Sequence, residues 1–386
     1  MKYSFFTILL LVGCADLDLS TRASSCPDTP NNTYARGAAL QEIISRYVKL
    51  GIPGISMAVR DGNTRWEGAA GFASIEQRVA MQSCHLLYSQ SVAKVYTGVT
   101  ILQLKEEGKI DLDQSIRLYL PEKIWKRIEH SDVITPRMLL NHTSGVFDYA
   151  YDYGSVTYLL NNGDRVWSQR FLLDFILDQK PLFYPGTKYS YANSGYTLLA
   201  VMAEHVSGKT HAQLIREKIL TPAGLQRTFY KDEIPAVVAQ GLVNSYFDRF
   251  SDGVLENISK PQLNNILSLM GDDSIVASSR DFVDFLDALA RGAFLSNATM
   301  AEMKTWVNNS KGKPAYGLGL AYHLEGDEWG FGHSGGGLGA GCILYHFPEK
   351  DVTVFLGVNM CTLLEGPATD QIEKMRKEIF DVLFQK

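Results

Sequence analysis

Ser91 and Lys94 form the first pair of residues whose types and spacing could carry chemistry. They are the first and last residues of Ser91-Val92-Ala93-Lys94. This stretch begins a helical pattern of apolar residues that ends at Gly108. Residues three apart on a helix share a face, so the lysine amine can reach the serine hydroxyl. A serine hydroxyl becomes a good nucleophile when a neighbouring group takes its proton, and N–H groups at a helix start stabilise an oxyanion. The pair predicts nucleophilic catalysis by Ser91.

The Ser-x-x-Lys pattern also has a purely structural interpretation, in which the serine caps a helix and the lysine is solvated. A second copy, Ser310-Lys311-Gly312-Lys313, lies in a loop that contains glycine and proline and offers no helix to align the two side chains. The pattern alone therefore does not establish a catalytic site, and other segments must supply the partners.

A tyrosine and an asparagine form the second candidate pair. Tyr191 and Asn193 follow a turn at 184–187 and precede a helix predicted over 194–206. Alternation of side chains would aim both residues into one cleft. A nearby Lys94 ammonium would lower the pKa of Tyr191 so that it acts as a base, and Asn193 would orient Lys94 or bind substrate. The structural alternative is a half-buried tyrosine and an asparagine that caps the helix.

A glycine-rich segment near the C-terminus supplies the third set of candidates. His333, Ser334 and Gly335 lie between strand-like runs, and Gly336 follows them. Glycines beside a strand allow a substrate backbone to approach closely, so an edge strand here could hold substrate by main-chain hydrogen bonds. The N–H of Gly336 is a candidate second oxyanion donor beside that of Ser91. The alternative is an ordinary glycine-rich turn.

The same segment also matches Gly-x-Ser-x-Gly, the nucleophile elbow of α/β-hydrolases, with Ser334 as the nucleophile. That elbow needs a strand, a sharp turn and a helix, followed by an acidic residue and then a histidine. A β-hairpin is predicted here instead, and Asp351 follows His346 rather than preceding it. The context argues against the elbow.

The elements that must position these residues predict an α+β fold. Two hairpin-like strand pairs lie at opposite ends of the chain, and adjacent hairpins favour an antiparallel sheet. We expect this sheet to be built from both chain ends with flanking helices, plus an inserted, mostly helical domain, and the active site in the groove between them. The predicted elements are helix 38–50, strands 54–60, 65–73, 315–323, 341–347 and 352–359, and helix 370–384. The predicted domains are 34–110 with 300–386 for the sheet and 111–299 for the helical insert.

The N-terminus predicts export. Lys2 precedes a short apolar run at 5–12, and Leu11-Val12-Gly13-Cys14 resembles the bacterial lipobox, in which the cysteine is lipidated. Residues 1–14 are therefore predicted to be a signal peptide and 15–33 a polar linker. We expect a periplasmic or cell-envelope lipoprotein, held at the membrane only by its lipid. Ordinary secretory cleavage is the alternative.

Composition is that of a soluble globular protein of 386 residues with a formal net charge of −5. No run of basic residues suggests a nucleic-acid partner. The eight histidines show no metal-site spacing, so neither a metal nor another cofactor is expected. An oxidising compartment would permit disulfides among Cys26, Cys84, Cys342 and Cys361, and the sequence does not choose between the three pairings.

The three motifs in this order resemble the serine β-lactamase and penicillin-binding superfamily, and in particular class C β-lactamases, D-alanyl-D-alanine carboxypeptidases, D-amino-acid peptidases and family VIII-type esterases. The stretches 134–145, 185–187 and 194–199 add to the likeness, which runs from about residue 38 to 359. The resemblance implies a sheet domain and a helical domain with the site between them.

The resemblance implies Ser91 as nucleophile, Lys94 and Tyr191 as a coupled proton-transfer pair, Asn193 as a positioning residue and His333 facing substrate. The implied reaction is acylation of Ser91 by an ester or amide, a D-amino-acid peptide or small carboxylic ester, followed by hydrolysis. One departure argues against efficient antibiotic hydrolysis, because β-lactamases usually carry lysine where this chain has histidine. A slow-turnover penicillin-binding or sensor protein and a true class C-like β-lactamase remain alternatives.

Overall fold

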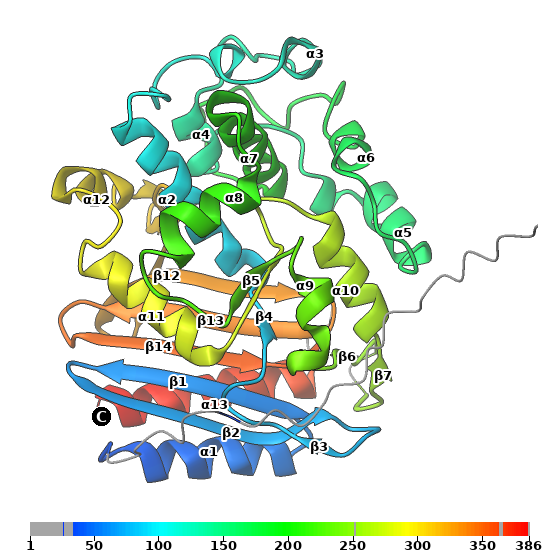
Figure 1. Ribbon diagram of the computed structural model, residues 1–386, viewed down its shortest axis with the longest axis vertical. Helices are drawn as coiled ribbons and strands as arrows, with labels where there is room; N and C mark the ends of the chain where they lie inside the picture. Colours follow the sequence, from blue (N-terminus) through cyan, green and yellow to red (C-terminus); the bar gives the residue numbers. More distant parts are fainter. Residues whose placement is uncertain (1–25, 27–33, 251, 363–365, 385–386) are drawn as a thin grey trace, which may run out of the picture.

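The structure is a computed structural model that describes residues 26, 34–250, 252–362 and 366–384. The predicted signal peptide, Cys14 and all of the predicted linker except Cys26 lie outside the described residues. A nine-stranded antiparallel sheet lies at one end of the molecule and a largely helical region stands over it (Figure 1). In sheet order its strands are β3 (Val79–Ala80), β2 (Thr64–Ser74), β1 (Gly54–Asp61), β14 (Val352–Val358), β13 (Ala340–Phe347), β12 (Glu328–Gly337), β11 (Ala321–Glu325), β10 (Pro314–Tyr316) and β9 (Val307–Asn308).

Strands from both chain ends meet at the centre of this sheet. Strand β1 pairs antiparallel with β14, in a register that sets Met57 opposite Leu356. Every residue of β14 is buried, because both faces of the sheet are covered. Val354 packs into the apolar cluster of one face and Phe355 into that of the other. The predicted antiparallel α+β fold, assembled from both ends of the chain, is confirmed.

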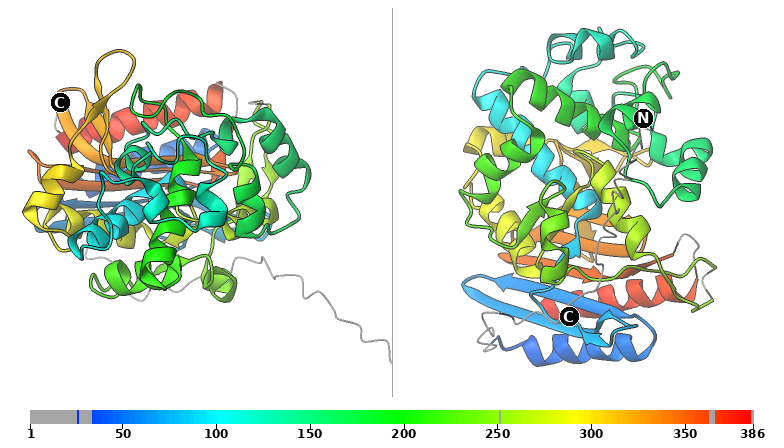
Figure 2. Two further views of the ribbon diagram at one scale, coloured as in Figure 1. Left: turned by 90° about the horizontal axis from the view of Figure 1, so that it is seen from above. Right: turned by 45° about the vertical axis from the view of Figure 1, so that its right-hand side comes forward.

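Helices α1 (Gly37–Lys49) and α13 (Pro367–Phe384) pack together on one face of the sheet, at the opposite end of the molecule from the helical region (Figure 2). Each is amphipathic. In α13 the buried residues Met375, Ile379 and Leu383 recur every four positions and form one stripe. Both predicted terminal helices are thus confirmed, with ends shifted by at most three residues.

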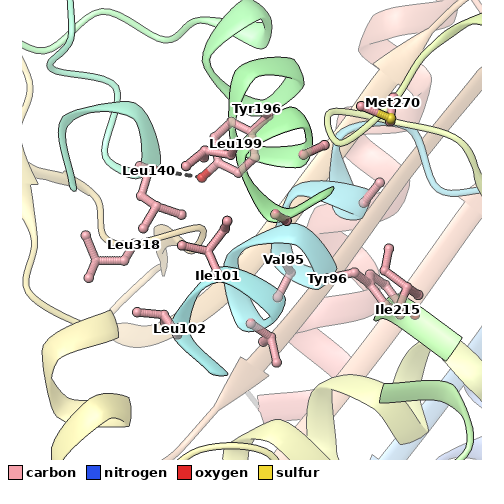
Figure 3. Close-up of a cluster of buried hydrophobic side chains, with 14 of the residues drawn as sticks. Val95, Tyr96, Ile101, Leu102, Leu140, Tyr196, Leu199, Ile215, Met270 and Leu318 are labelled. Atoms are coloured by element: carbon pink, nitrogen blue, oxygen red, sulfur yellow. Dashed lines mark hydrogen bonds between the residues drawn. The ribbon is translucent and has the colours of Figure 1, made fainter. Parts of the chain in front are cut away.

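Helix α2 (Ala93–Glu106) runs through the middle of the helical region and is buried on almost every side. A helix that is apolar all round belongs to a protein interior. Figure 3 shows its side chains against α4 (Pro136–Leu140) and α7 (Asn193–Ser207), where the Tyr196 hydroxyl donates to the Leu140 carbonyl at 2.7 Å. Helix α2 is therefore enclosed by elements on several sides, among them α7, α8 (His211–Ile215) and β12.

The remaining helices form the rest of the upper region, except that α11 packs on β1, β13 and β14 of the large sheet. They are α3 (Glu122–Trp125), α5 (Tyr153–Asn161), α6 (Gln169–Asp174), α8 (His211–Ile215), α9 (Ile234–Val237), α10 (Ser259–Ser268), α11 (Ser279–Ala290) and α12 (Asn297–Met303). Short 3-10 helices are η1 (Gln90–Val92), η2 (Ile116–Leu118), η3 (Tyr149–Tyr151) and η5 (Val238–Gln240), and η4 (Arg216–Leu220) is a π-helix. The predicted domain boundaries stay a prediction.

Two details differ from the expectations. The insert contributes strands to two small sheets, β4-β8-β5 and β15-β6-β7, formed by β4 (Leu87–Tyr88), β5 (Thr228–Tyr230), β6 (Tyr246–Phe247), β7 (Glu256–Asn257), β8 (Ile275–Ala277) and β15 (Met360–Cys361). The single strand predicted over 315–323 is broken into β10 and β11. It breaks because Gly319, at φ 91°, packs against Gly98 of α2, and a side-chain carbon on Gly319 would lie 3.0 Å from the Gly98 Cα.

Within the described residues, no helix has both the length and the apolar character needed to cross a membrane.

Candidate active site

Ser91 lies in the turn η1 that leads directly into α2, and it lines a cavity of ≈ 350 Å³. The preceding residue, Gln90, has a φ of 48°, a left-handed conformation that residues with side chains seldom adopt. This conformation turns the chain sharply just before the helix. Ser91 therefore stands where helix N–H groups have no partner within the helix.

Lys94 is 0 % exposed and makes three hydrogen bonds with its ammonium group. Its Nζ donates to Ser91 Oγ at 3.0 Å, to Asn193 Oδ1 at 2.8 Å and to the backbone carbonyl of Asp272 at 3.1 Å. Because Lys94 follows Ser91 by three residues at the helix start, both side chains lie on one face. The structure thus joins the first and second motifs at a single nitrogen.

The protonation of Lys94 reflects two opposed influences. Burial lowers its pKa from the ordinary value, because the charged form loses its hydration. The carboxylates of Asp272, Asp273 and Asp148 act in the opposite direction. The net shift is downward, so a neutral amine, able to take a proton from Ser91, becomes available at a lower pH than for a solvated lysine.

Asn193 is held so that its amide oxygen faces Lys94. Asp148 Oδ2 accepts from Asn193 Nδ2 at 3.1 Å, and Asp148 Oδ1 accepts from the N–H and the hydroxyl of Ser194 at 3.2 and 3.3 Å. Asp148 therefore accepts a backbone N–H from the first turn of α7, whose N-cap residue is Ala192 rather than Asn193. Sequence reasoning missed Asp148, which lies 45 residues away from Asn193 in the chain.

Tyr191 lies beside the same amine, with its ring centroid 5.1 Å from Lys94 Nζ. Its hydroxyl is buried and makes no hydrogen bond within the described residues, although Ser91 lies near enough to lower its pKa. Burial outweighs the effect of Ser91 and raises the pKa of Tyr191 well above its ordinary value. The expectation that Lys94 would lower that pKa is therefore wrong for the free protein. Tyr191 is a neutral phenol there, and Lys94 is the better proton acceptor.

Aromatic rings pack around Tyr191 and fix its orientation. The ring of His142 lies 4.3 Å from those of Tyr191 and Tyr316, and His142 Nδ1 accepts from the Ala192 N–H at 3.1 Å. His333 is 4 % exposed, and its Nε2 lies 2.8 Å from the Tyr316 hydroxyl. Burial lowers the pKa of His333 to about 3, so it is neutral. It lies next to Tyr191 in the interior and is not among the residues that line the cavity.

The glycine-rich segment forms the end of β12 rather than a turn and packs against η1. A side-chain carbon on Gly335 would lie 2.7 Å from the Ser89 carbonyl oxygen and 2.7 Å from Gln90 Cβ. By contrast, a side-chain carbon on Gly336 would meet nothing within 4 Å, and Gly336 lines the cavity with Ser91. The absence of a side chain at Gly335 lets the strand approach the turn that carries Ser91.

The Gly335→Ala variant should therefore displace the turn before Ser91 and lower kcat/KM for an ester substrate by about 100-fold, since a misplacement of about 1 Å has that effect. The matched control is Gly336→Ala, whose methyl group has room and should lower kcat/KM far less. Equal losses in the two variants would contradict the role given to the close approach at Gly335. Steady-state kinetics and a thermal melt of each variant check the prediction.

Ser334 points elsewhere. It lines a different cavity, which it shares with residues of α13, and β12 continues into β13 as a hairpin with no helix between them. His346 pairs with Thr353, and Asp351 forms an ion pair with Arg291. The nucleophile elbow is thus excluded by its context, and the second Ser-x-x-Lys copy lies in an exposed turn without a helix.

Two acidic residues at the cavity escaped the sequence reasoning. Asp272 and Asp273 line the cavity beside Ser91, and both are buried. The signal available in the sequence was a pair of adjacent aspartates inside the apolar stretch 269–276. Burial, and the neighbouring Asp272 charge, raise the pKa of Asp273 from 3.8 to about 7.

Asp273→Asn should change the pH dependence of stability. Because the folded-state pKa of Asp273 lies above its unfolded value, the folded protein binds the proton more tightly, and stability is lost as pH rises from about 4 through 7. The variant carries no such proton, so its free energy of unfolding relative to wild type should rise by about 1–4 kcal/mol between pH 4 and pH 8. Urea unfolding at the two pH values measures this difference. If the difference in free energy of unfolding between the variant and the wild type is the same at both pH values, the raised pKa of Asp273 is contradicted.

The antiparallel sheet, the helical region above it and the Ser91–Lys94 pair at a cavity define the class of serine β-lactamases and penicillin-binding proteins. A family model described as Beta-lactamase matches residues 40–372, and the chain belongs to this family. The resemblance inferred from the three motifs is confirmed.

Named relatives lie in the same class. Penicillin-binding protein 4* of Bacillus subtilis is 24% identical over 312 residues, which are 78% of this chain and 66% of the relative. The D-aminopeptidase of Brucella anthropi is 28% identical over 329 residues, 84% of this chain and 58% of the relative. The chain thus spans about three fifths to two thirds of the length of these curated relatives.

Solved structures show the same fold. The D-amino acid amidase from Ochrobactrum anthropi SV3, complexed with L-phenylalanine amide, superposes with a TM-score of 0.79 at 22% identity and covers 91% of this chain and 99% of its own. The D-stereospecific amidohydrolase from Streptomyces sp. has a TM-score of 0.75 at 26% identity, and the match covers 88% of this chain and 98% of the amidohydrolase. A penicillin-binding protein homologue from Pyrococcus abyssi, described as octameric, has a TM-score of 0.76 at 22% identity. The match covers 90% of this chain and 77% of the homologue.

Proposed function

We propose that this protein is a serine hydrolase that cleaves an ester or amide through an acyl-enzyme intermediate on Ser91. The observation that carries the proposal is the contact between the buried Lys94 Nζ and Ser91 Oγ, at 3.0 Å, on the wall of a cavity large enough for a small substrate. Asn193 holds the lysine in place from the other side. A solvated lysine beside a helix cap would show none of these features.

In the proposed reaction, neutral Lys94 takes the proton of Ser91 as the hydroxyl oxygen attacks the substrate carbonyl carbon. The N–H groups of Ser91 and Gly336 are the candidate donors to the oxyanion. Tyr191, a neutral phenol beside Ser91, passes its proton to the leaving group and regains one from Lys94. Water then attacks the acyl-enzyme by the reverse proton route, and the acid and free Ser91 are released.

Amide substrates with D-amino acids are the class that we propose first, with small carboxylic esters second. The similarity to a D-aminopeptidase and to D-stereospecific amide hydrolases supports this order. Efficient β-lactam hydrolysis ranks third, because His333 is neutral and buried and so offers no fixed cation for a substrate carboxylate.

A fluorophosphonate or penicillin probe tests the proposal. We expect an adduct on Ser91, located by peptide mass spectrometry, and hydrolysis of at least one substrate in a panel of p-nitrophenyl esters, D-alanyl dipeptides and nitrocefin. An adduct that never turns over would instead support a penicillin-binding or sensor protein, the alternative that its similarity to penicillin-binding proteins favours. Failure to label Ser91 under any condition would overturn both.

We also propose that the chain is exported and anchored through lipid on Cys14. The lipobox-like sequence supports the anchor, and the Cys26–Cys84 disulfide supports an oxidising compartment. Cys342 and Cys361 are free. Mass spectrometry of the mature N-terminus tests the anchor, and an unmodified N-terminus cleaved elsewhere would leave only secretion.

Breaking the disulfide should destabilise the protein. Cys26 and Cys84 close a loop with a sequence separation of 58, and a cross-link of this kind contributes about 2–4 kcal/mol by restricting the unfolded chain. We expect Cys26→Ser to lower the midpoint of urea unfolding. Cys361→Ser, which breaks no cross-link, is the control, and equal midpoints for the two variants would contradict the prediction.

A further inference from the structure

The cavity beside Ser91 is lined by two acidic residues and by apolar and aromatic side chains. Asp272 and Asp273 line it together with apolar side chains, which are Val156, Leu159, Leu160 and Leu269, and with the aromatic rings of Tyr149 and Tyr151. A carboxylate that is buried among apolar groups is costly unless it is paired or hydrogen-bonded. The partners of each carboxylate oxygen therefore indicate what the cavity is built to bind.

One oxygen of Asp272 lacks a partner. Its Oδ2 accepts a hydrogen bond from the Tyr149 hydroxyl at 2.6 Å, whereas its Oδ1 is buried and has no hydrogen-bond partner within the described residues. The residue as a whole is only 4 % exposed. The neighbouring Asp273 differs, because its Oδ1 accepts from the Ser274 N–H at 2.7 Å and from the Ser89 hydroxyl at 3.3 Å.

Lys94 does not supply the missing partner. The three hydrogens of its ammonium go to Ser91 Oγ, Asn193 Oδ1 and the backbone carbonyl of Asp272, not to the carboxylate. Nor do His, Cys, Asp and Glu side chains gather anywhere in the described part of the chain as they would around a metal ion. Asp272 Oδ1 can therefore accept from a small donor in the cavity, and a cationic donor makes the stronger, charge-assisted hydrogen bond to a carboxylate.

We propose that Asp272 binds the protonated amino group of the substrate, so that the protein acts on amides and esters of amino acids whose amine is free. This inference rests on the proposed function and names its substrate class. In an α-amino acid the ammonium is separated from the scissile carbonyl by one carbon. Asp272 lies near Ser91, since both residues line one cavity and Lys94 Nζ donates to Ser91 Oγ and to the backbone carbonyl of Asp272. The apolar walls suit a hydrophobic side chain on the same residue.

Competition against a reporter reaction tests this assignment. Hydrolysis of p-nitrophenyl acetate at pH 6.5, where an α-amino group is largely protonated, is inhibited with D-phenylalaninamide and separately with 3-phenylpropanamide, which has the same skeleton without the amine. We expect the amine to bind at least about 10-fold more tightly to the wild-type protein, as one charge-assisted hydrogen bond in a buried site allows. In Asp272→Asn the two inhibition constants should become equal within about twofold.

Asp273→Asn is the matched control at the neighbouring buried carboxyl group, because Asp273 Oδ1 already has hydrogen-bond partners in the protein. It should keep the preference to within about threefold of wild type. If both variants lose the preference for the amine equally, the overall negative potential of the cavity, and not Asp272, selects the amine. Equal inhibition constants for the two compounds in the wild-type protein would overturn the inference outright. Both of these outcomes are measured through hydrolysis of p-nitrophenyl acetate, so neither contradicts the proposed serine hydrolase function. If the protein neither hydrolyses this ester nor forms an adduct on Ser91, the proposed function itself is wrong. If Asp272→Asn does not fold, equal inhibition constants in the wild-type protein would still overturn the inference.

Discussion

The Ser91→Ala variant should lose about 10⁴–10⁶-fold in kcat/KM for any substrate that the wild-type protein hydrolyses. The loss is this large because the variant lacks the atom to which the acyl group would bind, while Lys94 and Tyr191 remain in place without a reaction to assist. The fold should survive, because Ser91 lies at the cavity surface and its hydroxyl accepts a hydrogen bond from Lys94, which remains in place. Covalent labelling by a fluorophosphonate should disappear together with turnover.

Two other serines serve as controls for Ser91. Ser334→Ala tests the residue that fits the nucleophile elbow, and Ser310→Ala tests the second Ser-x-x-Lys copy. Both should retain kcat/KM within about threefold, since neither side chain lines the cavity at Lys94. Retention of activity in Ser91→Ala, or its loss in Ser334→Ala, would refute the assignment of the nucleophile.

Lys94→Met should lower kcat by about 10²–10⁴-fold, the range typical for removal of a general base. Methionine nearly matches the length of the lysine stem but can neither take the Ser91 proton nor hold Asn193. The change also removes the Lys94 cation that interacts with the carboxylates of Asp148, Asp272 and Asp273. The pKa values of Asp272 and Asp273 should rise, so the variant should be relatively more stable at acidic pH.

The control for Lys94 is Lys313→Met, which changes the exposed lysine of the second Ser-x-x-Lys copy and should leave kcat unchanged. Single-turnover labelling of Ser91 measures the acylation step directly. If acylation is slowed by less than about tenfold in Lys94→Met while Tyr191→Phe abolishes it, then Tyr191 rather than Lys94 takes the proton. That result would also contradict the raised pKa of Tyr191.

The local motifs could be predicted from the sequence because each depends on short-range geometry. A serine and a lysine three apart at a helix start face the same side in any fold. The terminal helices could be predicted too, because their apolar stripes follow the helical period. The strand at 315–323 could not, since its break at Gly319 arises from contact with Gly98, more than 200 residues away in the chain.

The electrostatics of the site could not be predicted for the same reason. A neighbouring ammonium lowers the pKa of a phenol, and this is all that the sequence suggests for Tyr191. The tertiary structure packs the Tyr191 ring against His142, Tyr316 and His333 and buries its hydroxyl, and the lost hydration raises the pKa. Likewise, Asp272 lies 178 residues from Lys94, so no local pattern links them.

The sequence by itself determined the family, the antiparallel sheet from both chain ends and the pairing of Ser91 with Lys94, because apolar periodicity and helix geometry act over a few residues. Only the tertiary structure decided which carboxylates surround the lysine, which glycine must lack a side chain, and that Tyr191 stays a neutral phenol. These properties depend on burial and on contacts between distant segments. The central claim is that folding places one buried amine within reach of one serine hydroxyl, and full activity in a protein that lacks this amine would disprove it.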